Sequence, residues 1–276
     1  MAVKHITNNR LLAGKVRVAL VGCGGTGSQV LTGLARLHTA MVALGHPGGL
    51  DVTAYDPDTV SLANCGRQLF SPADQGQNKA VLLAHRLNAY FGLNWKAVPE
   101  KFDSNTRFGY NDQPHIIVSC LDTKAGRREI DKFCHNCGVY YWLDTGNEHT
   151  AGQVVLGQPA YRNDQRKRAN RKMDLPCVTD LYPQIMDVNE LEDDIPSCSL
   201  AASLEKQDLF INQQIATSAL QLLWQLFRNG GLDTHGAFIN LASGMVTPLP
   251  IDPDVWARFK PKKVRVRKPA QKKAEQ

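Results

Sequence analysis

Residues 15–28 read KVRVALVGCGGTGS, and this stretch decides the fold class. The run KVRVALVG is short, apolar and rich in β-branched residues, so it predicts a buried strand. Apolar residues then recur at helical spacing over residues 26–44. Between strand and helix, glycines let a backbone approach a phosphate, and a helix N-terminus attracts negative charge. The stretch predicts a nucleotide-binding turn, with a bare tight turn as the alternative. Its glycines are Gly22, Gly24, Gly25 and Gly27.

Strand and helix patterns alternate along the next part of the chain. Apolar runs predict strands over residues 51–56, 115–122 and 139–146. Helical spacing predicts helices over residues 78–91 and 123–137. This alternation is typical of a doubly wound, mostly parallel, Rossmann-like α/β sheet, whose ligands bind at the carboxyl ends of the strands.

The remaining chain predicts one domain over residues 1–250 and a tail over residues 251–276. Periodicity disappears in residues 159–200, which are polar, charged and rich in proline, so we expect a long functional loop there, a crossover or a lid. A helix is expected over residues 206–227. The segments GAFINLA and MVTPLP then predict a closing hairpin.

Composition places the chain among ordinary globular proteins, with 43% hydrophobic and 21% charged residues in 276. No apolar run approaches the roughly 18 residues of a membrane span, and the first residues lack a signal-peptide pattern. We therefore expect a cytoplasmic protein without a membrane partner. Seven cysteines, an odd count, favour reduced thiols over a disulfide framework.

The net charge of +6 comes from the tail. Residues 258–276 hold nine Lys or Arg and one Glu, or +8, which leaves about −2 for the rest. Such a tail is typical of a solvated, disordered end, and weak contact with nucleic acid or an acidic partner is the alternative.

Asp56 ends the second predicted strand, where a carboxylate can accept hydrogen bonds from ribose hydroxyls. A turn or cap aspartate before Pro57 is the alternative. A dehydrogenase fits these features as well as an ATP-using enzyme does.

Residues 56–68, DPDTVSLANCGRQ, distinguish an ATP-using enzyme from a dehydrogenase. The pattern D-x-D-x-V-S-x-x-N-x-x-R-Q after GxGGxGS resembles the signature of the ThiF/MoeB/HesA family, bacterial relatives of ubiquitin-activating enzymes. The resemblance continues at Lys79 in GQNKA and Asp122 in SCLDTKAGR, and it covers residues 10–155 well and 198–227 loosely. PSCS followed by QDLFINQQIA is similar to the ThiF-related proteins of the PRTRC gene system.

The resemblance implies ATP-dependent adenylation of the C-terminal carboxylate of a ubiquitin-like, β-grasp protein by a homodimer. It implies that Asp122 binds magnesium. Bringing a carboxylate to a triphosphate requires fixed positive charge, which Arg67 and Lys79 can supply with Asn64 and Gln68 as neutral donors. Asp58 either orients or caps the loop. Taken singly, Arg67 and Lys79 could equally be solvated cations.

In enzymes of this family, adenylation is often followed by attack of a cysteine, which gives an acyl thioester or a persulfide-linked species, and such a cysteine must be accessible as a thiolate. Cys198 is the candidate and Cys177 the second choice, while a spectator thiol is the alternative for both. We expect no zinc at Cys134 and Cys137, because no second C-x-x-C pair follows. Arg10 is the candidate for an arginine that reaches the site of a second subunit, or it is a surface residue.

Two other functions compete with adenylation. An NAD-dependent oxidoreductase would need affinity for nicotinamide, and Arg67 and Lys79 speak against it. An inactive nucleotide-binding scaffold would bind ATP without turning it over. Downstream of adenylation, sulfur transfer and protein conjugation both remain open.

Overall fold

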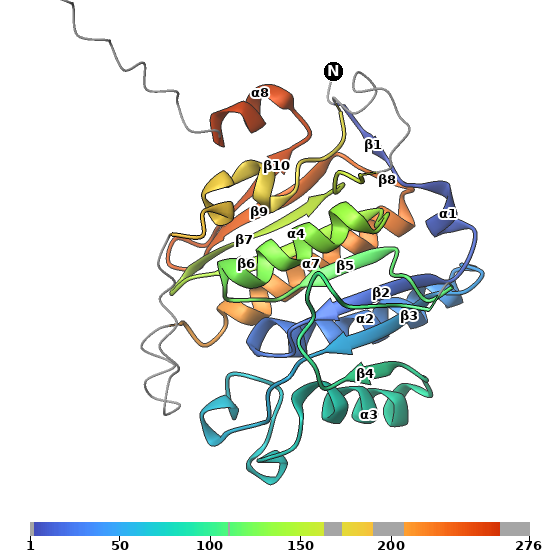
Figure 1. The fold of residues 1–276 in the computed structure, drawn as a ribbon, viewed down its shortest axis with the longest axis vertical. Helices are drawn as coiled ribbons and strands as arrows, with labels where there is room; N and C mark the ends of the chain where they lie inside the picture. Colours follow the sequence, from blue (N-terminus) through green and yellow to red (C-terminus); the bar gives the residue numbers. More distant parts are fainter. Residues whose placement is uncertain (1–2, 110, 163–172, 190–206, 260–276) are drawn as a thin grey trace, which may run out of the picture.

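The computed structural model describes residues 3–109, 111–162, 173–189 and 207–259. Its main feature is an eight-stranded sheet in the order β10-β9-β7-β6-β5-β2-β3-β4 (Figure 1). The parallel strands are β2 (Val16–Val21), β3 (Leu50–Tyr55), β4 (Lys96–Val98), β5 (Ile116–Ser119) and β6 (Tyr141–Asn147). The antiparallel strands are β7 (Ala151–Gly157), β9 (Thr234–Asn240) and β10 (Met245–Pro250). The doubly wound α/β prediction is confirmed.

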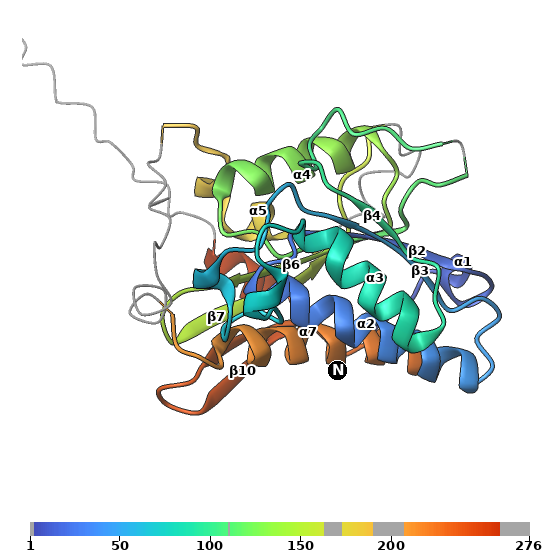
Figure 2. The same cartoon turned by 90° about the horizontal axis from the view of Figure 1, so that it is seen from below.

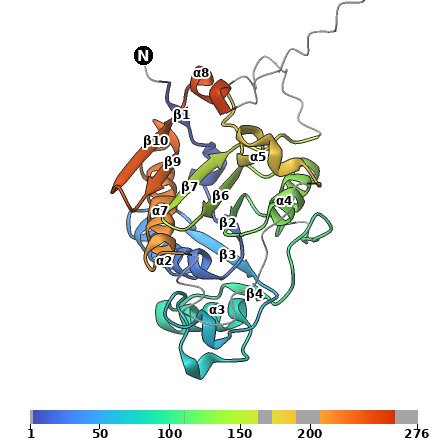
Figure 3. The ribbon, with the colours of Figure 1, turned by 90° about the vertical axis from the view of Figure 1, so that its left-hand side faces the viewer.

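Helices cover both faces of this sheet. Figures 2 and 3 show α4 (Lys124–Asn136) on one face and α2 (Gly25–Ala43), α3 (Lys79–Phe91) and α7 (Ile211–Arg228) on the other. Strands between two helical layers are buried on both sides, as β5 is, and three of its four buried residues are apolar. Helices α2 and α7 pack so closely that a Cβ at Gly33 would lie 2.0 Å from the Leu220 side chain, so glycine allows this approach.

Local signals explain where the predicted helices begin and end. The Asn78 side chain accepts a hydrogen bond from Val81 N at 3.0 Å and so caps α3. Thr123 caps α4 through Gly126 N at 3.1 Å. Gly92, with φ of 68°, ends α3 in a left-handed conformation that favours glycine.

The helix expected over residues 206–227 begins later, at Ile211. Asp208 accepts a hydrogen bond from the backbone N–H of Phe210 at 3.1 Å, which holds the preceding residues in a turn. Lys206 lies outside the described residues.

Two other expectations need correction. Within residues 159–200, the described part contains α5 (Val178–Leu181) and the 3₁₀ turn η4 (Pro183–Met186), both packed on α4. The folded domain also extends beyond residue 250, since Ile251 and Trp256 are buried. The rest of the tail, residues 260–276, lies outside the described chain.

The remaining elements are short. Strands β1 (His5–Ile6) and β8 (Gly231–Leu232) pair with each other. The others are α1 (Asn9–Leu12), α8 (Pro253–Trp256), η1 (Leu62–Asn64), η2 (Pro72–Asp74) and η5 (Ala257–Phe259). Among the described residues, no helix has both the length and the apolar character needed to cross a bilayer.

Candidate functional site

The predicted site residues gather where β2, β3 and β5 end, at the point where the strand order reverses. The glycine turn follows β2. Gly22 has φ of 91°, and a Cβ there would lie 2.5 Å from the carbonyl oxygen of Cys120. A Cβ at Gly27 would lie 1.9 Å from the carbonyl oxygen of Gly22. Both positions therefore require glycine, and the turn brings its backbone close to the end of β5.

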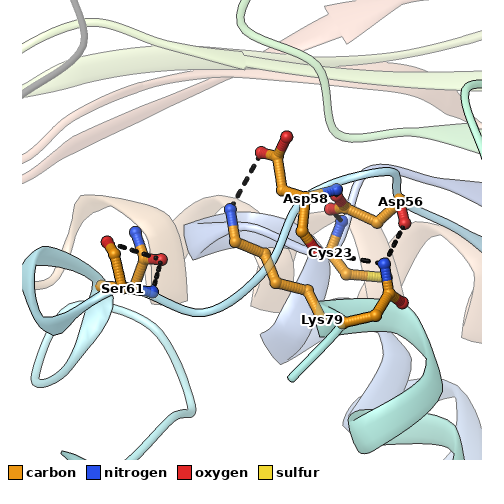
Figure 4. Close-up of polar contacts among 7 residues, drawn as sticks. Cys23, Asp56, Asp58, Ser61 and Lys79 are labelled. Atoms are coloured by element: carbon orange, nitrogen blue, oxygen red, sulfur yellow. Dashed lines mark hydrogen bonds and ion pairs between the residues drawn. The ribbon is translucent and has the colours of Figure 1, made fainter. Parts of the chain in front are cut away.

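Asp56 ties the glycine turn to the loop after β3 (Figure 4). Its Oδ2 accepts a hydrogen bond from Cys23 N at 2.6 Å, and its Oδ1 accepts one from Asp58 N at 2.8 Å. The residue is 5% exposed, and burial raises the pKa of its carboxyl group despite these two N–H donors. Carboxylate oxygens can accept further bonds, so the predicted contact with ribose stays a prediction.

Lys79 brings a buried positive charge to this loop. It is the first residue of α3 and 6% exposed, and its Nζ lies 3.0 Å from Oδ2 of Asp58, whose side chain is 65% exposed. Asn78 fixes the geometry by donating hydrogen bonds to the carbonyl oxygens of Asp56 and Asp58, at 2.8 and 3.1 Å. A cation is disfavoured at a helix N-terminus and in a buried position. Asp58 stabilises this ammonium group, and a bound anionic ligand would stabilise it further.

Arg67 and Gln68 leave polar atoms without partners. Nη1 of Arg67 donates to Oε1 of Gln207. In the described part of the chain, Arg67 Nε and Gln68 Oε1 are buried and make no hydrogen bond. Such atoms carry a free-energy cost that a bound ligand can remove. A third, Asn147 Nδ2, lies at the end of β6.

Asn64 has a local role that sequence reasoning missed. Its Oδ1 accepts hydrogen bonds from Ser61 N at 2.9 Å and Ser61 Oγ at 3.1 Å, which closes η1 in a capping box. Its predicted contact with phosphate stays a prediction. The backbone of Asn64 also accepts a bond from Gln68 N at 3.0 Å, so the loop that carries Arg67 is held from within.

Asp122 is exposed just beyond β5. Within residues 3–109, 111–162, 173–189 and 207–259, no three His, Cys, Asp or Glu side chains group as a metal site would require. Magnesium is commonly held by one or two carboxylates together with substrate phosphates and water. Asp122 alone therefore fits a magnesium ion that arrives with a nucleotide.

A buried polar network beside the site had no sequence motif. Asp144 is fully buried and accepts hydrogen bonds from Arg127 Nε, at 3.0 and 3.1 Å, and from Ser119 Oγ at 2.6 Å. Arg127 also donates to the carbonyl oxygen of Thr145 at 3.0 Å. The network joins the end of β5 and the middle of β6 to the first turn of α4. The sequence signal for this network was a charged residue within an apolar strand, Asp144, together with an arginine in the preceding helix, Arg127.

Of the two candidate thiols, the structure describes only Cys177, and it is buried. Cys198 lies outside the described residues. Cys177 is 3% exposed, and burial raises the pKa of its thiol well above the usual range. Cys177 therefore does not meet the requirement for an accessible thiolate. Arg10 donates a hydrogen bond to Tyr140 Oη at 3.1 Å, and Tyr140 directly precedes β6. Arg10 therefore lies at the amino ends of the parallel strands, whereas the glycine turn lies at their carboxyl ends.

A groove of about 340 Å³ lies on the antiparallel part of the sheet. Gln153, Phe238 and Thr247 stand side by side across β7, β9 and β10, and they line it with Asn240 and Met245. These side chains face away from α7, because the alternate residue Gly152 is the one that contacts it, through Ile215. The groove lies on β7, β9 and β10. Strand β7 pairs with β6, which pairs in turn with β5, one of the strands that end at the site.

Comparison with known proteins finds activating enzymes for ubiquitin-like modifiers that match part of this chain. The "Ubiquitin-like modifier-activating enzyme 5" of Oryza sativa subsp. japonica is 26% identical over 161 residues, which are 51% of this chain and 35% of that protein. The "Nedd8-activating enzyme E1 catalytic subunit" of Drosophila melanogaster is 26% identical over 194 residues, 64% of this chain and 38% of that protein. The chain spans little more than a third of these relatives' length.

Solved structures share the fold. The crystal structure of E. coli MccB superposes with a TM-score of 0.54 at 16% identity, covering 88% of this chain and 63% of MccB. MccB crystallised with ATP gives 0.53 at 16% identity, over 88% and 65%. The sequence profile of the ThiF family matches residues 7–247, most of the chain. The chain belongs to the ThiF family.

Proposed function

We propose that this chain binds ATP with magnesium and adenylates the C-terminal carboxylate of a small ubiquitin-like protein. The observation that carries the proposal is the buried ammonium group of Lys79 at the first turn of α3. A negatively charged ligand would stabilise both this cation and the helix N-terminus. The unpaired Nε of Arg67 supports a phosphate ligand at the same site. The relatives named as activating enzymes for ubiquitin-like modifiers support this reaction.

In this reaction, a carboxylate oxygen attacks the α-phosphorus of ATP. The new P–O bond forms as the bond to the bridging oxygen breaks, and pyrophosphate leaves with that electron pair. The glycine turn, Arg67 and Lys79 would hold phosphate oxygens, with Gln68 as a neutral donor, and so reduce the repulsion between the two anions. Asp122 would hold magnesium, which when bound supplies further positive charge to the phosphates.

We assign the acceptor's C-terminal tail to the groove on β7, β9 and β10. Gln153 of the groove pairs with Gly146 of β6, and a Cβ at Gly146 would lie 3.0 Å from Nη2 of Arg127. The strand beside the groove, β6, therefore carries Asp144 of the buried network next to the site. A short peptide is the second candidate acceptor, because one solved relative is MccB together with "MccA-N7isoASN".

Further parts of the proposal concern assembly and the later step. A homodimer would bring Arg10 of one subunit to the site of the other. The thiolate of Cys198 would attack the acyl carbon of the adenylate, so that a thioester forms as the C–O bond breaks and AMP leaves; a persulfide-linked species would require a separate sulfur donor. We also propose the cytoplasm as its location and the PRTRC-associated group as its place within the ThiF family.

Calorimetric titration with magnesium and ATP, and separately with NAD, tests the nucleotide site. Lys79→Met and Arg67→Ala should each weaken ATP binding about 10- to 100-fold, because a hydrogen bond to a charged group contributes about 1.5–3 kcal/mol. Lys132→Met is the matched control, since the Lys132 side chain is 56% exposed and pairs with Glu129 on α4. It should bind ATP like the unmodified protein.

The same titrations separate the rival functions. Binding of NAD in place of ATP would point to an oxidoreductase. If ATP binds but neither ubiquitin-like proteins nor peptides elicit pyrophosphate release, the chain is a nucleotide-binding scaffold and adenylation is refuted.

A further inference from the structure

A chain of polar contacts links the glycine turn to Arg67 through Asn212, in the first turn of α7, and Gln207, which precedes that helix. Oδ1 of Asn212 accepts a hydrogen bond from Thr26 Oγ1 at 3.0 Å. Nδ2 of Asn212 lies 3.5 Å from Oε1 of Gln207, which also accepts the bond from Arg67 Nη1. We call this set, Thr26, Asn212, Gln207 and Arg67, the polar relay. It joins parts of the chain that lie 140 and 186 residues apart in sequence.

Asn212 is the fixed point of the polar relay. It is 3% exposed, and its amide fills the space beside Gly25, where a Cβ would lie 2.7 Å from both Cγ and Nδ2 of Asn212. Both ends of this amide are hydrogen-bonded. The side chain is therefore held against the glycine turn and in turn holds Gln207.

The polar relay engages Nη1 of Arg67 and leaves Nε without a partner among the described residues. In a planar guanidinium group, Nε and Nη2 share an edge and can donate in parallel to two oxygens of one phosphate. Gln207 occupies Nη1, on the other side of the group. Within the described residues, Nε of Arg67 is buried and unpaired. A phosphate oxygen could accept the hydrogen bond that Nε of Arg67 does not make.

We propose that Gln207 is a positioning residue, which holds Nη1 of Arg67 so that its Nε–Nη2 edge faces a phosphate of the bound nucleotide. Asn212 keeps Gln207 in register with the glycine turn. The inference rests on the proposed nucleotide site and adds two residues to it that act through Arg67 and the turn.

Gln207→Met tests this assignment, because methionine has a similar size and accepts hydrogen bonds only weakly. The dissociation constant for magnesium and ATP should rise about tenfold, which corresponds to about 1.4 kcal/mol. The dissociation constant for adenosine should stay unchanged, since adenosine carries no phosphate. In the Arg67→Ala background, Gln207→Met should have no further effect on ATP. Gln213→Met, an exposed position on α7, is the matched control.

Asn212→Ser is the second variant. Serine keeps an oxygen near Thr26 but is too short to reach Gln207, so the same loss of ATP affinity, again dependent on Arg67, is expected. If both variants bind ATP like the unmodified protein, the positioning role is refuted while the nucleotide site stands. An equal loss for adenosine, or a loss that persists in Arg67→Ala, also refutes it. If the unmodified protein does not bind ATP, the proposed function itself fails.

Discussion

Replacing Gly25 with alanine should destabilise the fold, and the same change should stabilise it once Asn212 is shortened. The new Cβ would lie 2.7 Å from Cγ and Nδ2 of Asn212 and 2.9 Å from Oδ1, all shorter than ordinary contacts. The amide cannot move freely, because it is hydrogen-bonded and 3% exposed. Overpacking of this kind costs about 1–3 kcal/mol.

The backbone itself accepts alanine at this position. Gly25 is absent from the glycines with positive φ, and it is the first residue of α2. Without the clash, alanine should gain about 0.5 kcal/mol over glycine, because it loses less backbone entropy in a helix. The sign of the effect therefore depends on Asn212.

Urea denaturation of four proteins measures this coupling: the unmodified chain, Gly25→Ala, Asn212→Ala and the double variant. Gly25→Ala should lower the free energy of unfolding in the first background and raise it slightly in the second. The gain of alanine over glycine is common to both backgrounds, so the coupling equals the overpacking cost of about 1–3 kcal/mol. Asn212→Ala alone should cost about 1 kcal/mol, because Thr26 loses its acceptor. An equal effect of Gly25→Ala in both backgrounds would refute the reasoning.

Three further predictions concern stability, pH and thiol reactivity. Arg127→Met should lower the free energy of unfolding by about 3–5 kcal/mol, because it leaves the buried Asp144 carboxylate unpaired. Burial and nearby guanidinium groups lower the pKa of His115 from 6.5 to about 4, so the unfolded chain binds the proton more readily. Stability should then fall as the pH drops from 6.5 toward 4, and His115→Gln should flatten that slope. In the folded protein, the buried Cys177 should react with a thiol reagent far more slowly than the half-buried Cys65.

Each of these has a contrary outcome. A cost below about 1 kcal/mol for Arg127→Met would mean that Asp144 is not held ionised by that contact. An unchanged slope in His115→Gln would assign the pH dependence to other groups. Equal reaction rates of the two thiols would show that Cys177 is accessible, and would restore it as a candidate nucleophile.

The parallel half of the sheet could be predicted because each of its strands, turns and helices has a signal in its own local sequence. Apolar runs end in glycine or aspartate, and Asn78 and Thr123 cap the helices that follow. Strand β7 was missed because only VVL within AGQVVLG is a continuous apolar run and because the strand closely follows β6. The start of α7 was placed too early, because its amphipathic pattern continues through a turn that Asp208 holds.

The site residues of the motif could be predicted, but their arrangement could not. Spacing placed Asp56, Arg67 and Lys79 near one sheet edge. The bond between Arg67 and Gln207 joins segments 140 residues apart, and the pair of Arg127 and Asp144 depends on how α4 packs on β6. Contacts of this kind have no period along the chain, so only the folded structure reveals them.

The two cations of the site differ in a way that bears on how a triphosphate would bind. Lys79 is paired with a carboxylate, Asp58, whereas Arg67 is held by a neutral amide, Gln207. A phosphate near Lys79 must compete with an anion already present, but a phosphate on the free edge of Arg67 meets a full positive charge. Arg67 should therefore contribute more to nucleotide affinity than Lys79. The exposed Asp58 would then serve mainly to keep the Lys79 ammonium group stable while the site waits for its ligand.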